Sequence, residues 1–110
     1  MKIERALVKR ESLESFADTH NLTLSITERE KPDCYRLRYY VDFKHAEIKR
    51  DGCLISLTGN GTTEDEAIED YMKQISGELL IVHAYDKSKR KEIQVPFLNR
   101  VYNNKIEYEM

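Results

Sequence analysis

The sequence predicts an α+β fold, in which an antiparallel sheet of about five strands carries two helices packed on one face, a two-layer sandwich. Two patterns lead to this prediction. Apolar and polar residues alternate with a period of two over 22–27 and 35–44, as they do in half-buried strands. Over 63–77 apolar residues recur at spacings of three and four, which is typical of an amphipathic helix. The chain has no internal repeat and no linker, so 1–110 is expected to be a single α+β domain.

The N-terminal part is expected to contain one helix and two strands. Residues 1–8 are either a short edge strand or an extended lead-in. A short amphipathic helix is expected over 9–20, ending near Asn21, a residue type that tolerates the left-handed conformation. The strands at 22–27 and 35–44 follow. The apolar face of the second of these strands consists of Tyr35, Leu37, Tyr39, Val41 and Phe43.

The helix over 63–77 is the best-defined element of the chain. Thr63 followed by Glu66 is a capping box, in which each side chain bonds a backbone amide at the helix start. Gly77 stands where a left-handed residue would end the helix. The apolar stripe of this helix consists of Ala67, Ile68, Tyr71, Met72 and Ile75. We expect the helix to hold the sheet together rather than to form a site.

Further strands are expected on both sides of this helix. Asp51-Gly52 is a strong hairpin signal that joins 46–49 to 53–58. After the helix, 79–85 is almost entirely apolar and is interpreted as a buried central strand, with 92–95 as a further strand paired to it.

Composition excludes several classes of protein. The formal net charge of −2 argues against a protein that holds nucleic acid by bulk charge, and against an acidic mimic of DNA. No apolar run approaches the roughly 20 residues that cross a bilayer, and the N-terminus lacks the apolar core of a signal peptide. We therefore expect a cytoplasmic protein with no membrane contact. Cys34 and Cys53 are expected to remain thiols, with Cys53 in the core and Cys34 near the surface.

No catalytic constellation is evident, so we expect a protein that is not an enzyme and has no cofactor and no metal. The three histidines occur singly, outside any motif with a nucleophile, and together with two separate cysteines they lack zinc-site spacing. His20 is expected at a helix C-terminus and His45 at an exposed strand end. His83 is interpreted as an interface or hydrogen-bonded residue within a strand.

Gly59-Asn60-Gly61 precedes the main helix and invites a phosphate-binding interpretation. The start of that helix, however, is already occupied by its Thr63 cap and three carboxylates, and no lysine follows the glycines as it does in a phosphate loop. We therefore interpret the two glycines as a turn between strand and helix. Asn60 remains available for a polar contact at the surface.

One face of the strand at 35–44 is basic. Its candidate binding residues are Arg36, Arg38, Tyr40 and Lys44. Basic residues interleaved with an aromatic one can bind phosphates and stack bases, but a solvated sheet face also carries long charged side chains with acidic partners on neighbouring strands. A basic turn either extends this surface or forms a separate exposed loop; its candidate residues are Lys87, Lys89 and Arg90.

Two patterns resemble known families. The residues that carry the first are Tyr39, Val41, Phe43, Gly52, Cys53, Gly61, Thr63, Glu66 and Ala67. They resemble the HicB-like antitoxin fold, in which strands lead into a turn and a helix, and the resemblance implies an antitoxin role. The order helix, three strands, helix is also similar to that of double-stranded RNA-binding domains. Lysines open the second helix of those domains, whereas Glu64-Asp65-Glu66 would repel RNA here.

A longer stretch resembles the core of small proteins of bacteriophages and prophages. The matching residues are Gly59, Gly61, Thr63, Glu66, Ala67, Asp70, Tyr71, Gln74, Ile75, Ser76 and Gly77. The resemblance implies a setting in which small non-enzymatic proteins inhibit host defence. The leading hypothesis is therefore a phage-type binding protein that occupies a surface of a host defence protein such as a CRISPR nuclease, an anti-CRISPR-like role.

The alternative hypothesis is a nucleic-acid or nucleotide-binding module that uses the basic sheet face, and the HicB-like antitoxin is a further one. The oligomeric state stays open between monomer and homodimer, because unpaired strand edges tend to be covered. The apolar residues of 97–110 are expected to pack on the body of the protein or on a partner.

Overall fold

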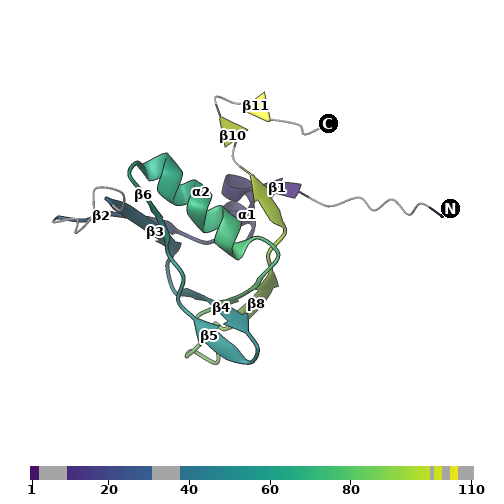
Figure 1. Cartoon of the computed structure of the whole chain (residues 1–110). Helices are drawn as coiled ribbons and strands as arrows, with labels where there is room; N and C mark the ends of the chain where they lie inside the picture. The colour runs from purple at the N-terminus through teal and green to yellow at the C-terminus, as the bar shows by residue number, and fades with distance from the viewer. Residues whose placement is uncertain (3–9, 31–37, 100, 103–104, 107–110) are drawn as a thin grey trace.

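The computed structural model describes residues 1–2, 10–30, 38–99, 101–102 and 105–106. The predicted lead-in strand at 1–8, beyond its first two residues, lies outside the described residues, as do Cys34 and Arg36. In chain order the elements are β1 (Arg10–Ser12), α1 (Leu13–Thr19), β2 (Leu24–Glu28), β3 (Tyr39–Phe43), β4 (Ala46–Arg50), β5 (Cys53–Ile55), β6 (Gly59–Gly61), α2 (Glu64–Ile75), β7 (Leu79–Val82), β8 (Lys91–Gln94), β9 (Phe97–Asn99), β10 (Val101–Tyr102) and β11 (Lys105–Ile106) (Figure 1).

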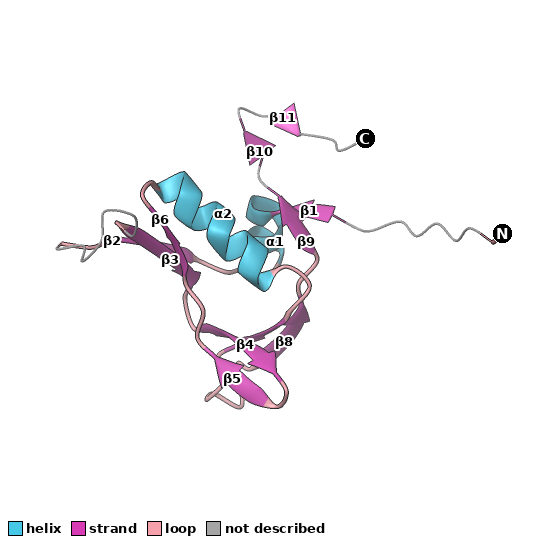
Figure 2. Cartoon of the chain, viewed as in Figure 1, coloured by secondary structure: helices cyan, strands magenta, loops and turns pink. Residues whose placement is uncertain are grey.

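The strands form two main antiparallel sheets (Figure 2). One sheet has the strand order β2-β3-β6, and the other has the order β5-β4-β7-β8. In addition, β1 pairs in parallel with β9, and β10 pairs antiparallel with β11. The α+β class predicted from the sequence is confirmed, although the strands are divided among several small sheets instead of forming one.

The division arises within one long hairpin, whose arms are β3–β4 and β5–β6. The pairs that flank the division are Ile48↔Ile55 and Val41↔Gly59. Between these pairs one arm contains the six residues 42–47 and the other the three residues 56–58. Because one arm has three residues more, the ladder cannot continue, and the longer arm makes a turn at Lys44 and His45. The tip of the hairpin is the predicted Asp51-Gly52 turn, with φ of 49° and 79°.

Both helices cover the same face of the β2-β3-β6 sheet. The ring of Phe43 in β3 lies 6.2 Å from that of Phe16 in α1 and 5.6 Å from that of Tyr71 in α2, centroid to centroid. The Phe43 amide also donates a 3.1 Å hydrogen bond to the Tyr71 hydroxyl. The core continues between α2 and the second sheet; its other fully buried members include Val41, Ile48, Ala67, Ile75, Leu80 and Val95.

β6 passes directly beneath α2, and this close approach explains its two glycines. A Cβ atom at Gly59 would collide with the Ala67 carbonyl oxygen and with Tyr71, and one at Gly61 would lie 2.6 Å from the Ala67 amide nitrogen. The sequence interpretation of these glycines as a turn is therefore wrong. They form a strand whose missing side chains let the helix backbone approach.

The start of α2 is capped as predicted. The Thr63 side chain accepts a 3.1 Å hydrogen bond from the Glu66 amide. The Glu66 carboxylate accepts from the amide of Thr62 at 2.9 Å and from its hydroxyl, one residue before the cap. The hydrogen bonds from Thr62 lower the pKa of Glu66 because they stabilise the ionised form. The side chains of Thr63 and Glu66 are thus occupied by hydrogen bonds within the start of the helix.

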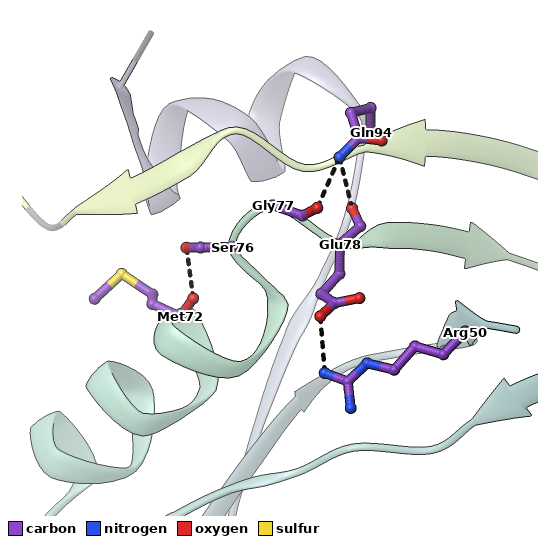
Figure 3. A network of polar contacts seen from close by, with 6 residues as sticks. All are labelled: Arg50, Met72, Ser76, Gly77, Glu78 and Gln94. Atoms are coloured by element: carbon purple, nitrogen blue, oxygen red, sulfur yellow. Dashed lines mark hydrogen bonds and ion pairs between the residues drawn. The ribbon is translucent and has the colours of Figure 1, made fainter. Parts of the chain in front are cut away.

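The end of α2 is fixed by the turn into β7. Gly77 has a φ of 78°, as the sequence predicted for the residue that ends the helix. The Gln94 side chain of β8 donates to the carbonyl oxygens of Gly77 at 2.9 Å and Glu78 at 3.4 Å (Figure 3). Arg50 of β4 donates to the Glu78 carboxylate at 2.9 Å. The turn that ends α2 is therefore bonded both to β4, through Arg50, and to β8, through Gln94.

Several boundaries and burial predictions differ from the structure. α1 begins at Leu13, because Ser12 accepts a 3.1 Å hydrogen bond from the Ser15 amide as N-cap, and 10–12 form β1 instead. The strand predicted to reach 85 ends at Val82. Cys53 was expected in the core but is exposed, because it lies beside the hairpin tip.

The C-terminal segment was expected to pack on the body or on a partner. Leu98 of β9 packs against the core, and its amide donates to the Ser76 hydroxyl at 3.1 Å. Phe97, by contrast, is 53% exposed. The side chains of 100–110 lie outside the part of the chain that is described.

Candidate functional site

The face of the β2-β3-β6 sheet that lies away from the helices is the first candidate surface, and we call it the open face. Tyr40 of β3 stands opposite Thr27 of β2 and Asn60 of β6, and Asp42 stands opposite Ser25. Because successive strand residues point to opposite faces, these side chains lie away from Val41 and Phe43, which contact the helices. The open face therefore presents an aromatic ring among polar groups.

A guanidinium–aromatic cluster stands at the centre of the open face. The Arg29 guanidinium carbon lies 4.7 Å from the centroid of the Tyr40 ring, and the same group donates a 2.9 Å hydrogen bond to the Asn60 side-chain oxygen. Asn60 is held in turn, since its side-chain amide donates to Thr58 and its backbone amide donates to Asp70 of α2 at 2.9 Å. The three side chains are therefore positioned before any ligand arrives.

The predicted basic residues of β3 do not all join this cluster. Arg38 donates two hydrogen bonds to one oxygen of Glu28, at 2.9 Å and 2.6 Å. These bonds raise the pKa of the Arg38 guanidinium group. Its guanidinium lies 5.6 Å from the ring of Tyr39, a residue that packs against the core. Lys44 is exposed in the turn after β3. Arg36 lies outside the described residues.

The predicted loop residues lie in the turn between β7 and β8. Lys87 and Lys89 are exposed. Arg90 donates to the Ala84 carbonyl oxygen at 3.2 Å and lies 3.9 Å from the Glu92 carboxylate. This turn belongs to the second sheet, so it does not continue the Arg29–Tyr40–Asn60 cluster.

A pocket of about 420 Å³ lies where β3 and β7 end. Four parts of the chain contribute to its wall: the end of β3, the start of β4 with the turn before it, Ser56 after β5, and the segment that follows β7. The side chains that matter chemically are Asp42, His45, Glu47, His83, Tyr85 and Asp86. Asp42 also belongs to the open face, so the pocket adjoins that face.

Two histidines form one wall of the pocket. The rings of His45 and His83 stack at 4.9 Å between centroids, with 20° between their planes. Both residues have left-handed backbones, with φ of 61° and 52°, and the His83 amide donates a 2.8 Å hydrogen bond to the His45 carbonyl oxygen. His45 is exposed, as predicted. His83 was expected within a strand, but it lies beyond the end of β7.

Two carboxylates of the pocket differ in their surroundings. The pKa of Asp42 is raised because partial burial disfavours its charged form. The pKa of Asp86 is lowered, mainly because the Ser88 hydroxyl and amide donate to its carboxylate, at 2.7 Å and 3.0 Å. Asp86 is thus held ionised, whereas Asp42 carries an uncompensated desolvation penalty.

Asp42→Asn should make the isolated protein more stable at pH 7. A carboxylate with a raised folded-state pKa loses its proton earlier in the unfolded chain, so the free energy of unfolding falls as pH rises through the folded-state pKa. Asparagine has no such proton to lose. Urea unfolding at pH 4 and pH 7 should show a small gain for the variant, confined to pH 7. A loss of stability at pH 7 would contradict this account.

A second pocket of about 300 Å³ lies on the other side of His83 and is lined by His20, Asn21, Ser88, Lys89 and Lys91 among others. His20 is the C-cap of α1, as predicted, and its ring lies 4.8 Å from that of Phe16. All three histidines of the chain therefore gather near the end of β7, although the sequence places them far apart.

The described residues offer neither a metal cluster nor a membrane-spanning helix. Within them, no group of three or more His, Cys, Asp or Glu side chains is arranged to hold a metal ion. None of the described helices has the length and apolar character needed to cross a membrane.

Comparison with protein-family models, with curated proteins and with solved structures gave no match. The proposed function therefore rests on the residues of the open face, and the proposed class of target rests on the sequence resemblance to small phage proteins.

Sequence reasoning missed Arg29, Asp42 and Tyr85. Arg29 lies one residue beyond the end of β2, yet its amide donates to the Arg38 carbonyl oxygen at 2.8 Å and its side chain reaches the open face. The available signal was the alternation Ser25, Thr27, Arg29, which continues the polar side of β2 by one residue. Asp42 had a comparable signal, because it alternates with Val41 and Phe43 and so shares the face of Tyr40. Tyr85 had none, because its place in the pocket depends on the division of the sheets.

Proposed function

We propose that the chain is a non-enzymatic binding protein whose target is another protein, and that it binds this target through the open face. The observation that carries the proposal is the preorganised cluster of Arg29, Tyr40 and Asn60. Tyr and Arg are the side chains most often found at the energetic centres of protein interfaces. A cluster already fixed by Thr58 and Asp70 loses little conformational entropy when it binds.

The charges on this surface favour a protein over a nucleic acid. Arg38, one of the cations of the predicted basic face, forms an ion pair with Glu28. Asp42 stands on the open face beside Tyr40 and would repel phosphate. Arg29 itself is engaged with Tyr40 and Asn60. An aromatic residue and an arginine with polar side chains around them match the usual composition of a protein interface, in which aromatic residues and Arg are enriched and the rim is polar.

The class of target is proposed from the resemblance of the sequence core to small proteins of bacteriophages and prophages. In that setting the chain would act in the cytoplasm of a bacterial host, as a monomer or homodimer, by occupying a surface of a host defence protein such as a CRISPR nuclease. Occupation of a surface needs no catalytic group, which agrees with a site built from aromatic, guanidinium and amide side chains.

The proposal is tested by phage restriction. A phage targeted by a CRISPR nuclease is plated on hosts that carry one of a panel of such nucleases, with and without expression of the chain. We expect plaque formation to be restored for at least one nuclease. Tyr40→Ala should abolish the restoration, because loss of a central interface side chain costs about 2 kcal/mol or more, roughly 30-fold in Kd.

Lys73→Ala is the matched control, since Lys73 is exposed on α2, on the side of the sheet away from the open face. This variant should restore plaques as the unmodified chain does. Two results would overturn the proposal: no restoration with any nuclease, or equal loss in both variants. Salt-dependent binding of an oligonucleotide that Tyr40→Ala weakens would establish the nucleic-acid alternative instead.

A further inference from the structure

We propose that the pocket between the ends of β3 and β7 receives an arginine side chain of the protein partner. The inference rests on the proposed function for the source of that side chain, but the affinity of the pocket for a guanidinium group can be measured on the isolated chain.

The charge of the pocket is the first argument. Asp42 of β3, Glu47 of β4 and Asp86 after β7 line it, and no lysine or arginine of the described residues belongs to its wall. Several cations stand close to the lining residues in the sequence without lining the pocket, among them Lys44, Lys49, Lys87, Lys89 and Arg90. Lys44 is exposed in its turn and Arg90 is engaged by Ala84 and Glu92. Three carboxylates thus line the pocket. Asp86 already accepts two hydrogen bonds from Ser88 and stands near Lys89, so Asp42 and Glu47 are the ones that a cationic ligand would meet.

The aromatic surfaces of the pocket are the second argument. The stacked rings of His45 and His83 provide a flat wall, and the Tyr85 side chain, which also lines the pocket, is 87% exposed. A large aromatic side chain left this exposed is available to a partner. A guanidinium group is planar and weakly hydrated, so it stacks on such rings better than an ammonium group does.

Asp42 supplies the third argument. Of the described residues, none donates a hydrogen bond to the Asp42 carboxylate or forms an ion pair with it, and burial alone accounts for the shift of its pKa. Glu47 is half-buried in the same wall. A guanidinium group has five N–H donors in a fixed fork, which suits it to a carboxylate such as that of Asp42.

The volume and the position of the pocket agree with a side chain delivered by a protein. About 420 Å³ accommodates a guanidinium group and its alkyl stem with room to spare. Since Asp42 belongs to both the pocket and the open face, a partner bound over Tyr40 can present a side chain to the pocket.

The test is an NMR titration of the isotope-labelled full chain with N-acetyl-arginine amide at constant ionic strength. We expect saturable shifts of the Asp42 carboxyl carbon and of the His45 and His83 ring signals, with a Kd in the millimolar range. The double variant Asp42→Asn/Glu47→Gln should bind at least about tenfold more weakly, as expected when hydrogen bonds to charged groups are lost. N-acetyl-lysine amide should bind more weakly than the arginine compound.

Glu64→Gln/Asp18→Asn is the matched control, because it also removes two negative charges, both from exposed helical positions that do not line the pocket. Its affinity should equal that of the unmodified chain. Shifts that never saturate, or equal weakening in both double variants, would overturn the inference. The plaque assay separates the two proposals. If the chain binds the arginine compound but restores no plaques, the arginine site stands and the proposed function is overturned. If it restores plaques but does not bind the arginine compound, the proposed function stands and the arginine site is overturned.

Discussion

Gly59→Ala should destabilise the fold by about 3 kcal/mol or more, the largest loss that we expect from any single methyl group in this chain. The added Cβ would collide with the Ala67 carbonyl oxygen and with both the backbone and the side chain of Tyr71. Neither obstacle is the flexible end of a side chain, so α2 would have to move away from β6. That movement would open the contact between the helix and the sheet on which the core depends.

Urea unfolding followed by circular dichroism measures this loss. Gly52→Ala is the control, because Gly52 has a φ of 79° but an added methyl carbon there would meet no atom within 4 Å. It should lose only the roughly 1–2 kcal/mol of a left-handed backbone conformation. Equal losses in the two variants would show that backbone strain, and not the approach of the helix, governs position 59.

Tyr71→Phe should give the second-largest effect, about 1–3 kcal/mol. The Tyr71 hydroxyl accepts the hydrogen bond of the Phe43 amide in a buried setting, and phenylalanine would leave that amide without a partner. The ring would still fill the same space against Phe43. The expected loss therefore reports the hydrogen bond rather than the packing.

Tyr71 should also make the folded protein less stable at alkaline pH. Burial raises the pKa of Tyr71 to about 12 from an ordinary value of 10.0, because the charged form is disfavoured. The folded state thus keeps its proton while the unfolded chain loses it, so the free energy of unfolding falls as pH rises from about 10 to about 12. A shift of this size corresponds to roughly 2–3 kcal/mol.

Unfolding curves at pH 8, 10 and 11.5 distinguish the contribution of the hydrogen bond to Phe43 from that of the raised pKa of Tyr71. The unmodified chain should lose stability over this range, and Tyr71→Phe should lose markedly less. Tyr85→Phe serves as the control, since Tyr85 is exposed and its loss should leave the alkaline dependence unchanged. If Tyr71→Phe follows the same pH curve as the unmodified chain, another group causes the loss of stability at alkaline pH.

The elements that the sequence predicted well are those set by interactions over a few residues. Thr63 and Glu66 meet across one helical turn, and Gly77 and Asn21 adopt left-handed conformations at the ends of the helices that they follow. Asp51-Gly52 closes its hairpin for the same local reason. In each case the residue types and their spacing are enough to predict the local conformation.

The candidate site depends on contacts that spacing does not encode. Arg29 meets Asn60 only because β3 brings β2 and β6 into one sheet, and His45 meets His83 because β4 pairs with β7. The same limit explains the errors. Cys53 looked apolar enough for the core, yet it lies beside the hairpin tip. The glycines of β6 were taken for a turn because nothing local revealed how near the helix would pass.

The unequal arms of the long hairpin have a consequence for how this protein can diversify. On the longer arm, Asp42 and Phe43 still pair with β2, and Ala46 and Glu47 pair with β7. On the shorter arm, 56–58 lie between β5 and β6 and belong to no strand, so this short segment is the part of the hairpin outside the ladders. Insertions or deletions at 56–58 would reshape the wall of the pocket at Ser56 while Val41 and Ile48 keep their strand partners. Relatives that bind different targets are thus expected to vary in length here first, with the scaffold on either side left intact.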